Sequence, residues 1–187
     1  MRKTLLALAI FGVSVGSVSA ASYDLDPAHT FPNFTISHLG FSTMHGHFAK
    51  TAGTLELDMA KKTGSVDVTI DAASVYTGFA KRDEHLRSAD FFNVVEFPAI
   101  TFKSTKVKFT SDKTAEVEGN LTIVGKTNPV TLMVTSIVCG AHPMNKKEMC
   151  GFDATVKIKR SDYGVKFGLP AVGDEVTINL EAEGIKK

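Results

Sequence analysis

The chain has 187 residues, of which 43% are hydrophobic and 22% are charged, so it is long enough for one domain with a sizeable core and is not intrinsically disordered. Its 21 basic and 20 acidic side chains leave a formal net charge of +1, without a long run of either sign. A chain so evenly charged offers no basic field to a nucleic-acid backbone, and we expect no nucleic-acid partner.

The first segment has the pattern of a secretory signal peptide. A short basic start precedes an apolar stretch from Leu5 to Val18, and small residues follow. This stretch is shorter than the roughly 20 residues of a spanning helix, which makes a retained membrane anchor the weaker alternative. We predict a signal peptide at 1–20, with Ala21 as an alternative last residue, and a mature domain at 21–187 without a membrane span. The predicted location is the periplasm.

Beyond this segment, apolar and polar residues alternate with a period of two, which is typical of antiparallel strands with one buried face. We expect strands at 34–38, 55–59, 66–71, 100–102, 117–123, 130–138, 152–158 and 176–182. Only the stretch 79–90 is convincingly helical, because it is rich in helix formers and places Phe79 and Leu86 on one face.

These elements predict an all-β fold in which eight antiparallel strands form a barrel and one short helix closes an end. Two stacked sheets are the alternative for the same strands. An outer-membrane barrel also alternates, but the 3 Tyr and the absence of Trp cannot supply two aromatic girdles, so we favour a soluble barrel.

The two cysteines, Cys139 and Cys150, enclose a polar loop. In an exported protein such a pair is expected to form a disulfide, and the pair lacks the C-x-x-C spacing of a redox-active site. Cys139 is out of step with the apolar residues of its strand, whereas Cys150 is in step with those of the next. A β-bulge near Gly140 or Gly151 is therefore expected.

Phenylalanine is frequent, with 13 residues in the chain. The rings either pack into a solid core or line a tube that holds an apolar ligand. By strand parity His38 points into the barrel, on the same face as Phe34 and Ile36. There it is either a hydrogen-bonded core residue or a contact for a ligand head group.

Motifs for catalysis or metal binding are almost absent. The G-x-S-x-G match at 12–16 falls within the predicted signal peptide, and the charged cluster at 83–85 is typical of a solvated helix surface. His45 and His47 are spaced to share a metal on a strand, but both point outward if Phe48 points inward, and no third ligand follows. We predict no catalytic residue, no metal site and no cofactor.

Several segments together resemble the YceI-like family of polyisoprenoid-binding periplasmic proteins. They are YDLDPAHT at 23–30, FTISHLGFS at 34–42, RDEHLRSADFF at 82–92 and RSDYG at 160–164, with further matches at 46–48, 97–98, 101–104, 119–123, 127–132 and 173–176, and they are specific in combination. The resemblance covers essentially the whole mature chain. It implies a lipocalin-like barrel around an elongated apolar pocket for an isoprenoid chain, such as an isoprenoid quinone tail or a polyprenyl phosphate, or for another long amphiphile. It also implies a loose link to stress response and to lipid or quinone carriage.

From this we expect a non-enzymatic carrier. The side chains expected to contact the apolar chain of the ligand are Phe34, Ile36, Phe41, Phe48, Phe102, Leu121 and Ile158, with Phe79, Leu86, Phe91 and Phe92 as a gate around the helix. The side chains expected at a polar head are His38, Arg82, His85 and Arg87. The alternatives are a small lipid-modifying enzyme and a structural or partner-binding barrel with a filled core. A homodimer through an exposed strand is a further expectation.

Overall fold

The structure, a computed structural model, describes residues 20–187, so that nearly all of the predicted signal peptide lies outside the described residues. The strands are β1 (Ala21–Leu25), β2 (Phe31–His38), β3 (Ser42–Phe48), β4 (Thr51–Asp58), β5 (Thr63–Asp71), β6 (Val75–Tyr76), β7 (Ala99–Phe109), β8 (Ala115–Ile123), β9 (Lys126–Ala141), β10 (Glu148–Lys159) and β11 (Val172–Lys186). One α-helix, α1 (Ala80–Arg87), and two 3-10 turns, η1 (Ala72–Ser74) and η2 (Arg160–Tyr163), complete the described elements. None of the helices in this part of the chain is long and apolar enough to span a membrane.

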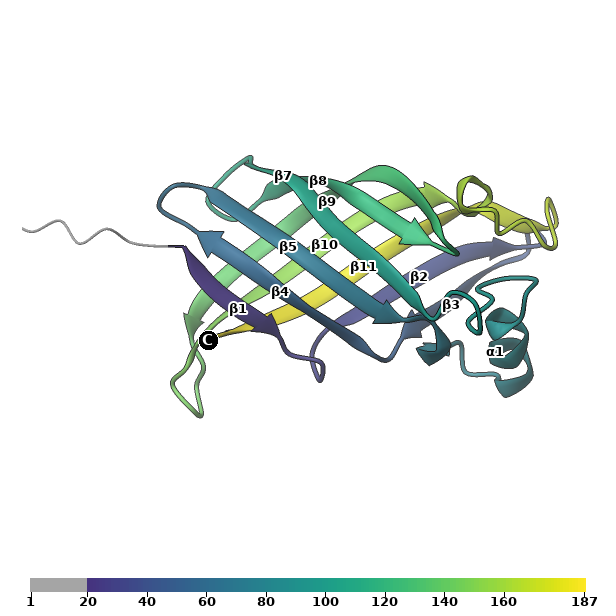
Figure 1. Ribbon diagram of the computed structural model, residues 1–187, viewed down its shortest axis with the longest axis horizontal. Helices are drawn as coiled ribbons and strands as arrows, with labels where there is room; N and C mark the ends of the chain where they lie inside the picture. Colours follow the sequence, from purple (N-terminus) through teal and green to yellow (C-terminus); the bar gives the residue numbers. More distant parts are fainter. Residues whose placement is uncertain (1–19) are drawn as a thin grey trace, which may run out of the picture.

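The strands form one antiparallel barrel (Figure 1). The closed ring runs β1-β4-β5-β7-β8-β9-β10-β11, and β11 pairs back onto β1. These eight strands confirm the predicted eight-stranded antiparallel barrel with one short helix.

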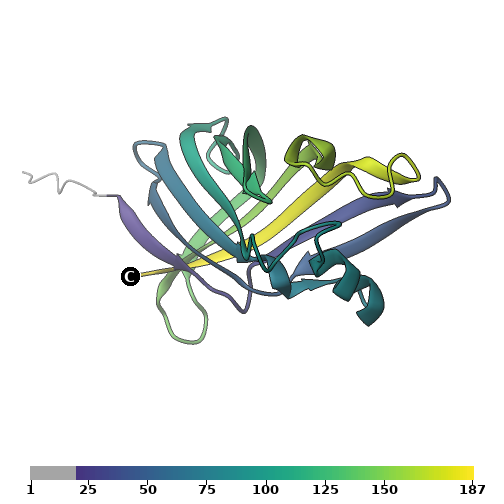
Figure 2. The same cartoon turned by 45° about the vertical axis from the view of Figure 1, so that its right-hand side comes forward.

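Three strands of the ring, β1, β4 and β5, are each continued by a neighbouring strand in the sequence after a short interruption. β2 pairs with β11 between Val172 and Glu181, and β1 pairs with its last part from Gly184 to Lys186, on either side of a break at residues 26–30. β3 continues into β4 in the same way, and β6 continues β5 after the turn η1. The β2–β3 hairpin therefore extends one end of the barrel, as seen on the right of Figure 1 and Figure 2.

Each predicted strand corresponds to an observed one, but β1, β3 and the two-residue β6 were not predicted. β1 has only five residues, and β3 carries Ser42, Thr43, His45 and His47 among its seven residues, so its apolar alternation is weak. The predicted helix at 79–90 is present and shorter. It ends at Arg87, where the Ser88 amide donates a hydrogen bond of 3.0 Å to the His85 carbonyl.

The predicted disulfide joins Cys139 of β9 to Cys150 of β10, which are direct partners across the two strands. A bulge does bring them into register, but its predicted place near Gly140 or Gly151 is wrong. The register shifts at Thr135, because Asp153 pairs with Ser136 while Ala154 pairs with Val134. Beyond this bulge Val138 points outward, contrary to its predicted place on the apolar face, and is 63% exposed.

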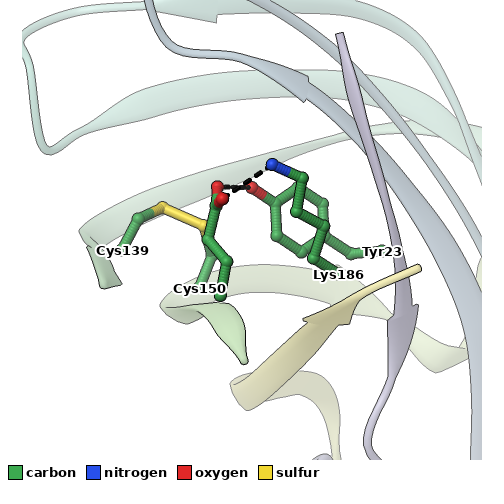
Figure 3. The surroundings of a disulfide bond; sticks show 5 residues. Tyr23, Cys139, Cys150 and Lys186 are labelled. Atoms are coloured by element: carbon green, nitrogen blue, oxygen red, sulfur yellow. Dashed lines mark hydrogen bonds and ion pairs between the residues drawn. A yellow bond between two sulfur atoms is a disulfide. The ribbon is translucent and has the colours of Figure 1, made fainter. Parts of the chain in front are cut away.

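The two ends of the barrel differ. At the disulfide end Tyr23, Leu57 and Cys150 form a small buried core. The Tyr23 hydroxyl donates a hydrogen bond of 2.9 Å to Glu148 Oε1, and Lys186 Nζ lies 2.6 Å from Glu148 Oε2, as Figure 3 shows. At the opposite end α1, η2 and the β2–β3 turn surround the barrel (Figure 2). One end is thus packed with protein side chains, and the other is bordered by loops and the helix.

Candidate functional site

The interior of the barrel contains a cavity of about 470 Å³. Inward-facing residues of the strands line it together with residues of α1 and the nearby loops. Most of them are apolar, from Leu25 and Phe109 near the disulfide end to Phe91 and Phe92 beside α1. The volume lies within the range of about 300–1,000 Å³ that is usual for small-molecule sites. The phenylalanine rings therefore pack against one another at some points without filling the barrel.

The apolar residues predicted to contact a ligand mostly face this cavity. Those on the lining are Phe34, Ile36, Phe48, Leu86, Phe91, Phe92, Phe102, Leu121 and Ile158. Some of these rings contact one another: the centroids of Phe34 and Phe48 lie 5.9 Å apart, and those of Phe48 and Phe92 lie 5.4 Å apart. These contacts connect the barrel strands to the segment after α1.

Three of the predicted site residues lie outside the cavity lining. Phe41 is 90% exposed at the β2–β3 turn, where it projects from the hairpin rather than into the barrel. Phe79 is 56% exposed directly before α1, with Arg82 5.8 Å from its ring centroid. Arg87 donates hydrogen bonds to the carbonyls of Ala73 and Val75, so it ties the helix to the neighbouring turn. Sequence periodicity could not place residues of turns and helix ends, because no strand parity applies to them.

Most polar side chains of the lining lie at the α1 end. His38, Thr77, Arg82, His85, Arg160 and Tyr163 are the members of this group. The predicted head-group residues His38, Arg82 and His85 are thus brought to the same end of the cavity. The polar residues farther along the barrel are small or uncharged, and they include Thr30 and Thr51.

Hydrogen bonds hold the Arg82 side chain in place at the α1 end of the cavity. Its Nε donates to Thr77 Oγ1 over 2.7 Å, and its Nη2 donates to the Thr77 carbonyl over 2.7 Å. The Thr77 amide in turn donates to Asp83 Oδ1 over 2.9 Å. Asp83 is buried, so the predicted solvated cluster at 83–85 contains one carboxylate that anchors the start of α1 instead.

Three rings meet at the mouth of the cavity. The His85 ring lies 5.0 Å from Phe91 and 4.9 Å from Phe167, and the two phenylalanines lie 5.4 Å apart. His85 Nε2 lies 2.7 Å from Asp90 Oδ2, which orients the imidazole. One aromatic side chain from α1, one from the segment after it and one from the loop before β11 thus form a single cluster at the opening.

The similarity to known proteins agrees with this architecture. The model of the YceI-like domain matches residues 23–184. The chain belongs to the YceI-like family.

Relatives and solved structures support the assignment. Protein YceI of Shigella flexneri is 41% identical over 192 residues, covering 100% of both proteins. The crystal structure of Burkholderia cenocepacia BcnA has a TM-score of 0.77 at 28% identity, over 85% of this chain and 98% of that one. A structure described as a polyisoprenoid binding domain of Saccharophagus degradans shares the fold, with a TM-score of 0.68 at 16% identity, over 89% of this chain and 99% of that one.

Arg160 is a residue of this YceI-like chain that sequence analysis missed. It lies on the cavity lining and is 6% exposed. Its guanidinium donates four hydrogen bonds of 2.8 to 3.1 Å, whose acceptors are the carbonyls of Val165, Phe167, Val172 and Gly173. Burial lowers the pKa of this guanidinium from its usual value, and nearby Asp174 opposes that effect.

The signal for Arg160 was present in the sequence, because it continues the inward parity of Val156 and Ile158 at the end of β10. Phe167 was also missed, and it has no comparable signal because it lies in a loop. Arg160 donates a hydrogen bond of 2.9 Å to the Phe167 carbonyl, which links this loop to the cavity lining.

The described residues also bring together Asp26, His29 and Glu183, outside the cavity at the break between β1 and β2. His29 Nδ1 lies 2.8 Å from Asp26 Oδ2 and 3.8 Å from Glu183 Oε2. The hydrogen bond with His29 lowers the pKa of Asp26, and the same bond raises the pKa of His29. The group links the break to β11, and its contacts become ion pairs when His29 is protonated.

Proposed function

We propose that this chain is a non-enzymatic binding protein that carries an isoprenoid lipid, of the quinone or polyprenyl type, or another long amphiphile in the barrel cavity. The observation that carries the proposal is an apolar cavity whose charged side chains are gathered at one end. Such a cavity matches a molecule with a hydrocarbon chain and a polar head. The Saccharophagus degradans domain is described as polyisoprenoid binding, which supports the same ligand class here.

Burial of the hydrocarbon chain drives uptake in this proposal. Each 100 Å² of apolar ligand surface removed from water contributes about 2.5 kcal/mol. The proposed contacts are the lining residues Phe34, Ile36, Phe48, Phe102, Leu121 and Ile158, with Leu86, Phe91 and Phe92 near the opening.

The polar head would lie at the α1 end, where His38, Arg82, His85 and Arg160 face the cavity. An arginine is suited to a phosphate or a carbonyl, because its planar guanidinium can donate parallel hydrogen bonds. Four N–H groups of Arg160 already donate to backbone carbonyls. Arg82 is therefore the arginine with more free donors for a ligand head group.

The proposed location is the periplasm, with the domain at 21–187 released after removal of the signal peptide. The basic start, apolar stretch and small residues at 1–20 support this proposal. A homodimer would form through β3, because β6 pairs only with His47 and Phe48 of that strand.

A lipid extraction tests the proposal. We expect organic extraction of the protein purified from its native periplasm, followed by mass spectrometry, to release a long-chain amphiphile in stoichiometric amount. The protein stripped in this way should take up an added isoprenoid quinone. Absence of both results would contradict the carrier function and favour a barrel that acts as a scaffold.

Cavity-filling variants show where the ligand binds. Val134 and Ala154 face each other across β9 and β10 and both line the cavity. We expect the double variant Val134→Phe, Ala154→Phe to lose quinone uptake at least tenfold. The matched control is Met133→Phe, since Met133 neighbours Val134 and is absent from the lining. Equal uptake by the filled variant would place the ligand outside the barrel.

A further inference from the structure

Exposed apolar side chains gather around the mouth of the barrel. Leu39 is 50% exposed, Phe41 90%, Phe79 56% and Phe167 49%. They come from three separate segments, namely the β2–β3 turn, the residue before α1 and the loop before β11. Figure 2 shows these segments at the same end of the molecule. We call these four residues the apolar rim.

Contacts between the three segments hold the rim together. The Leu39 amide donates a hydrogen bond of 2.8 Å to the Ala171 carbonyl, which joins the β2–β3 turn to the loop before β11. The Phe167 ring lies 4.9 Å from His85 of α1. The rim is therefore part of one surface, although its residues are far apart in the sequence.

The rim continues directly into the cavity. Phe167 lines the cavity and is also half exposed, and His38, which precedes Leu39 in the chain, lies on the lining as well. A hydrocarbon chain leaving the cavity would thus meet apolar side chains at the opening before it met water.

Basic side chains lie next to the rim residues in the sequence. Residues 39–43, 78–82 and 164–170 contain Lys81, Arg82 and Lys166. Of the acidic residues beside them, Asp83 is buried and Asp90 is held by His85, whereas Glu84 and Asp162 are exposed. Lys81 and Lys166 are exposed. Apolar side chains at loop tips with basic residues beside them are suited to a surface that combines hydrocarbon with negative charge, which is an anionic bilayer.

We propose that the apolar rim docks on an anionic lipid bilayer and that the ligand passes between membrane and cavity through this contact. The inference rests on the proposed lipid-carrier function. It adds the bilayer as the source and acceptor of the ligand, and it names the apolar rim as the side chains that insert into that bilayer.

The first experiment measures binding to vesicles of phosphatidylethanolamine and phosphatidylglycerol by co-sedimentation. The rim variant is Phe41→Ser with Leu39→Asn, because Leu39 has a φ of 54° and asparagine tolerates this left-handed conformation. We expect this variant to bind at least tenfold more weakly than the wild type. The Lys81→Ala, Lys166→Ala variant should lose binding mainly on vesicles that contain phosphatidylglycerol.

The opposite end of the barrel supplies the matched control. Val138 and Met144 are 63% and 86% exposed there, outside the rim. We expect Val138→Thr with Met144→Ser to bind vesicles like the wild type. An unchanged rim variant, or an equal loss in this control, would overturn the proposed docking surface.

A second measurement separates docking from ligand binding. An isoprenoid quinone delivered in detergent without vesicles should bind the rim variant and the wild type with equal affinity, because neither Leu39 nor Phe41 lines the cavity. Transfer of the same quinone from vesicles should be at least tenfold slower for the rim variant. Failure of every variant to bind quinone in detergent would contradict the carrier function, whereas unchanged transfer from vesicles would contradict the docking alone.

Discussion

Thr51 places a hydroxyl group within the apolar lining of the cavity. The residue is 4% exposed, and its Oγ1 has no hydrogen-bond partner among the described residues. A buried polar group left without a partner costs about 1–3 kcal/mol. Thr51 pairs with Ile70 across β4 and β5, and both residues belong to the mostly apolar lining.

Replacing this hydroxyl by a methyl group should stabilise the ligand-free protein. We expect Thr51→Val to raise the free energy of unfolding by about 1 kcal/mol, because valine has nearly the same shape and no polar group to desolvate. Urea denaturation of the lipid-extracted protein measures the change. Thr54→Val, on the exposed face of the same strand, is the control and should change little. A loss of stability in Thr51→Val would show that the hydroxyl has a favourable partner.

Asp26 and His29 give a second prediction, on pH dependence. Their hydrogen bond raises the pKa of His29, so the folded chain holds that proton more tightly than the unfolded chain does. The stabilisation from His29 is therefore complete below about pH 6.5 and is lost as the pH rises through the raised pKa. The pKa of Asp26 is lowered, so its contribution is present above about pH 4 and is lost as the pH falls through that lowered pKa.

An NMR titration of the imidazole protons checks this assignment. In Asp26→Asn the pKa of His29 should fall toward its ordinary value, because the main cause of its increase is removed. Glu183→Gln should have a smaller effect, since Glu183 lies 3.8 Å away compared with 2.8 Å for Asp26. An unchanged His29 pKa in Asp26→Asn would contradict the ion pair.

At the level of the strands, alternation predicted the elements better than their irregularities. The alternating residues of β5, β8 and β11 identify these strands, because each has one face in the barrel. The bulge at Thr135 could not be located in this way, since any one-residue shift between Val134 and Cys139 restores the register. The break at 26–30 was missed for a related reason, namely that β1 is too short to show a period.

The crosslink between β9 and β10 can be tested apart from its packing. Cys150 is fully buried, whereas Cys139 is exposed. Cys139→Ala therefore removes the disulfide and leaves the buried sulfur in place. We expect a loss of about 3 kcal/mol in the free energy of unfolding, from the loop entropy that the bridge removes from the unfolded chain.

Urea denaturation of this variant and of the reduced wild-type protein should give the same loss. A much smaller loss in both would indicate that Tyr23 and Glu148 already hold this end of the barrel without the crosslink. A large loss in the variant alone would point to packing of the Cys139 side chain instead.

For the whole molecule, strand count and single-sided apolar faces were enough to predict a closed barrel, but not a hollow one. Whether rings such as Phe34, Phe48 and Phe92 fill the interior depends on their rotamers and on the barrel diameter, and neither has a sequence signal. The structure shows these rings in contact near α1 and open space beyond them. The apolar lining was thus predictable residue by residue on the strands, whereas the rim and the loop residue Phe167 were not.

A hollow barrel should gain stability when the cavity is occupied. Binding to the folded state alone adds about 2.7 kcal/mol when the free ligand is at about 100 times its Kd. In a domain of this size that corresponds to a rise in Tm of roughly 5–10 °C. We expect this rise when lipid-extracted protein is reloaded with an isoprenoid quinone in detergent, measured by thermal denaturation against detergent alone. The variant Val134→Phe, Ala154→Phe should show no rise, because its own rings occupy the space. The Met133→Phe control should respond like the wild type, and an equal rise in the filled variant would mean that the stabilising ligand lies outside the barrel.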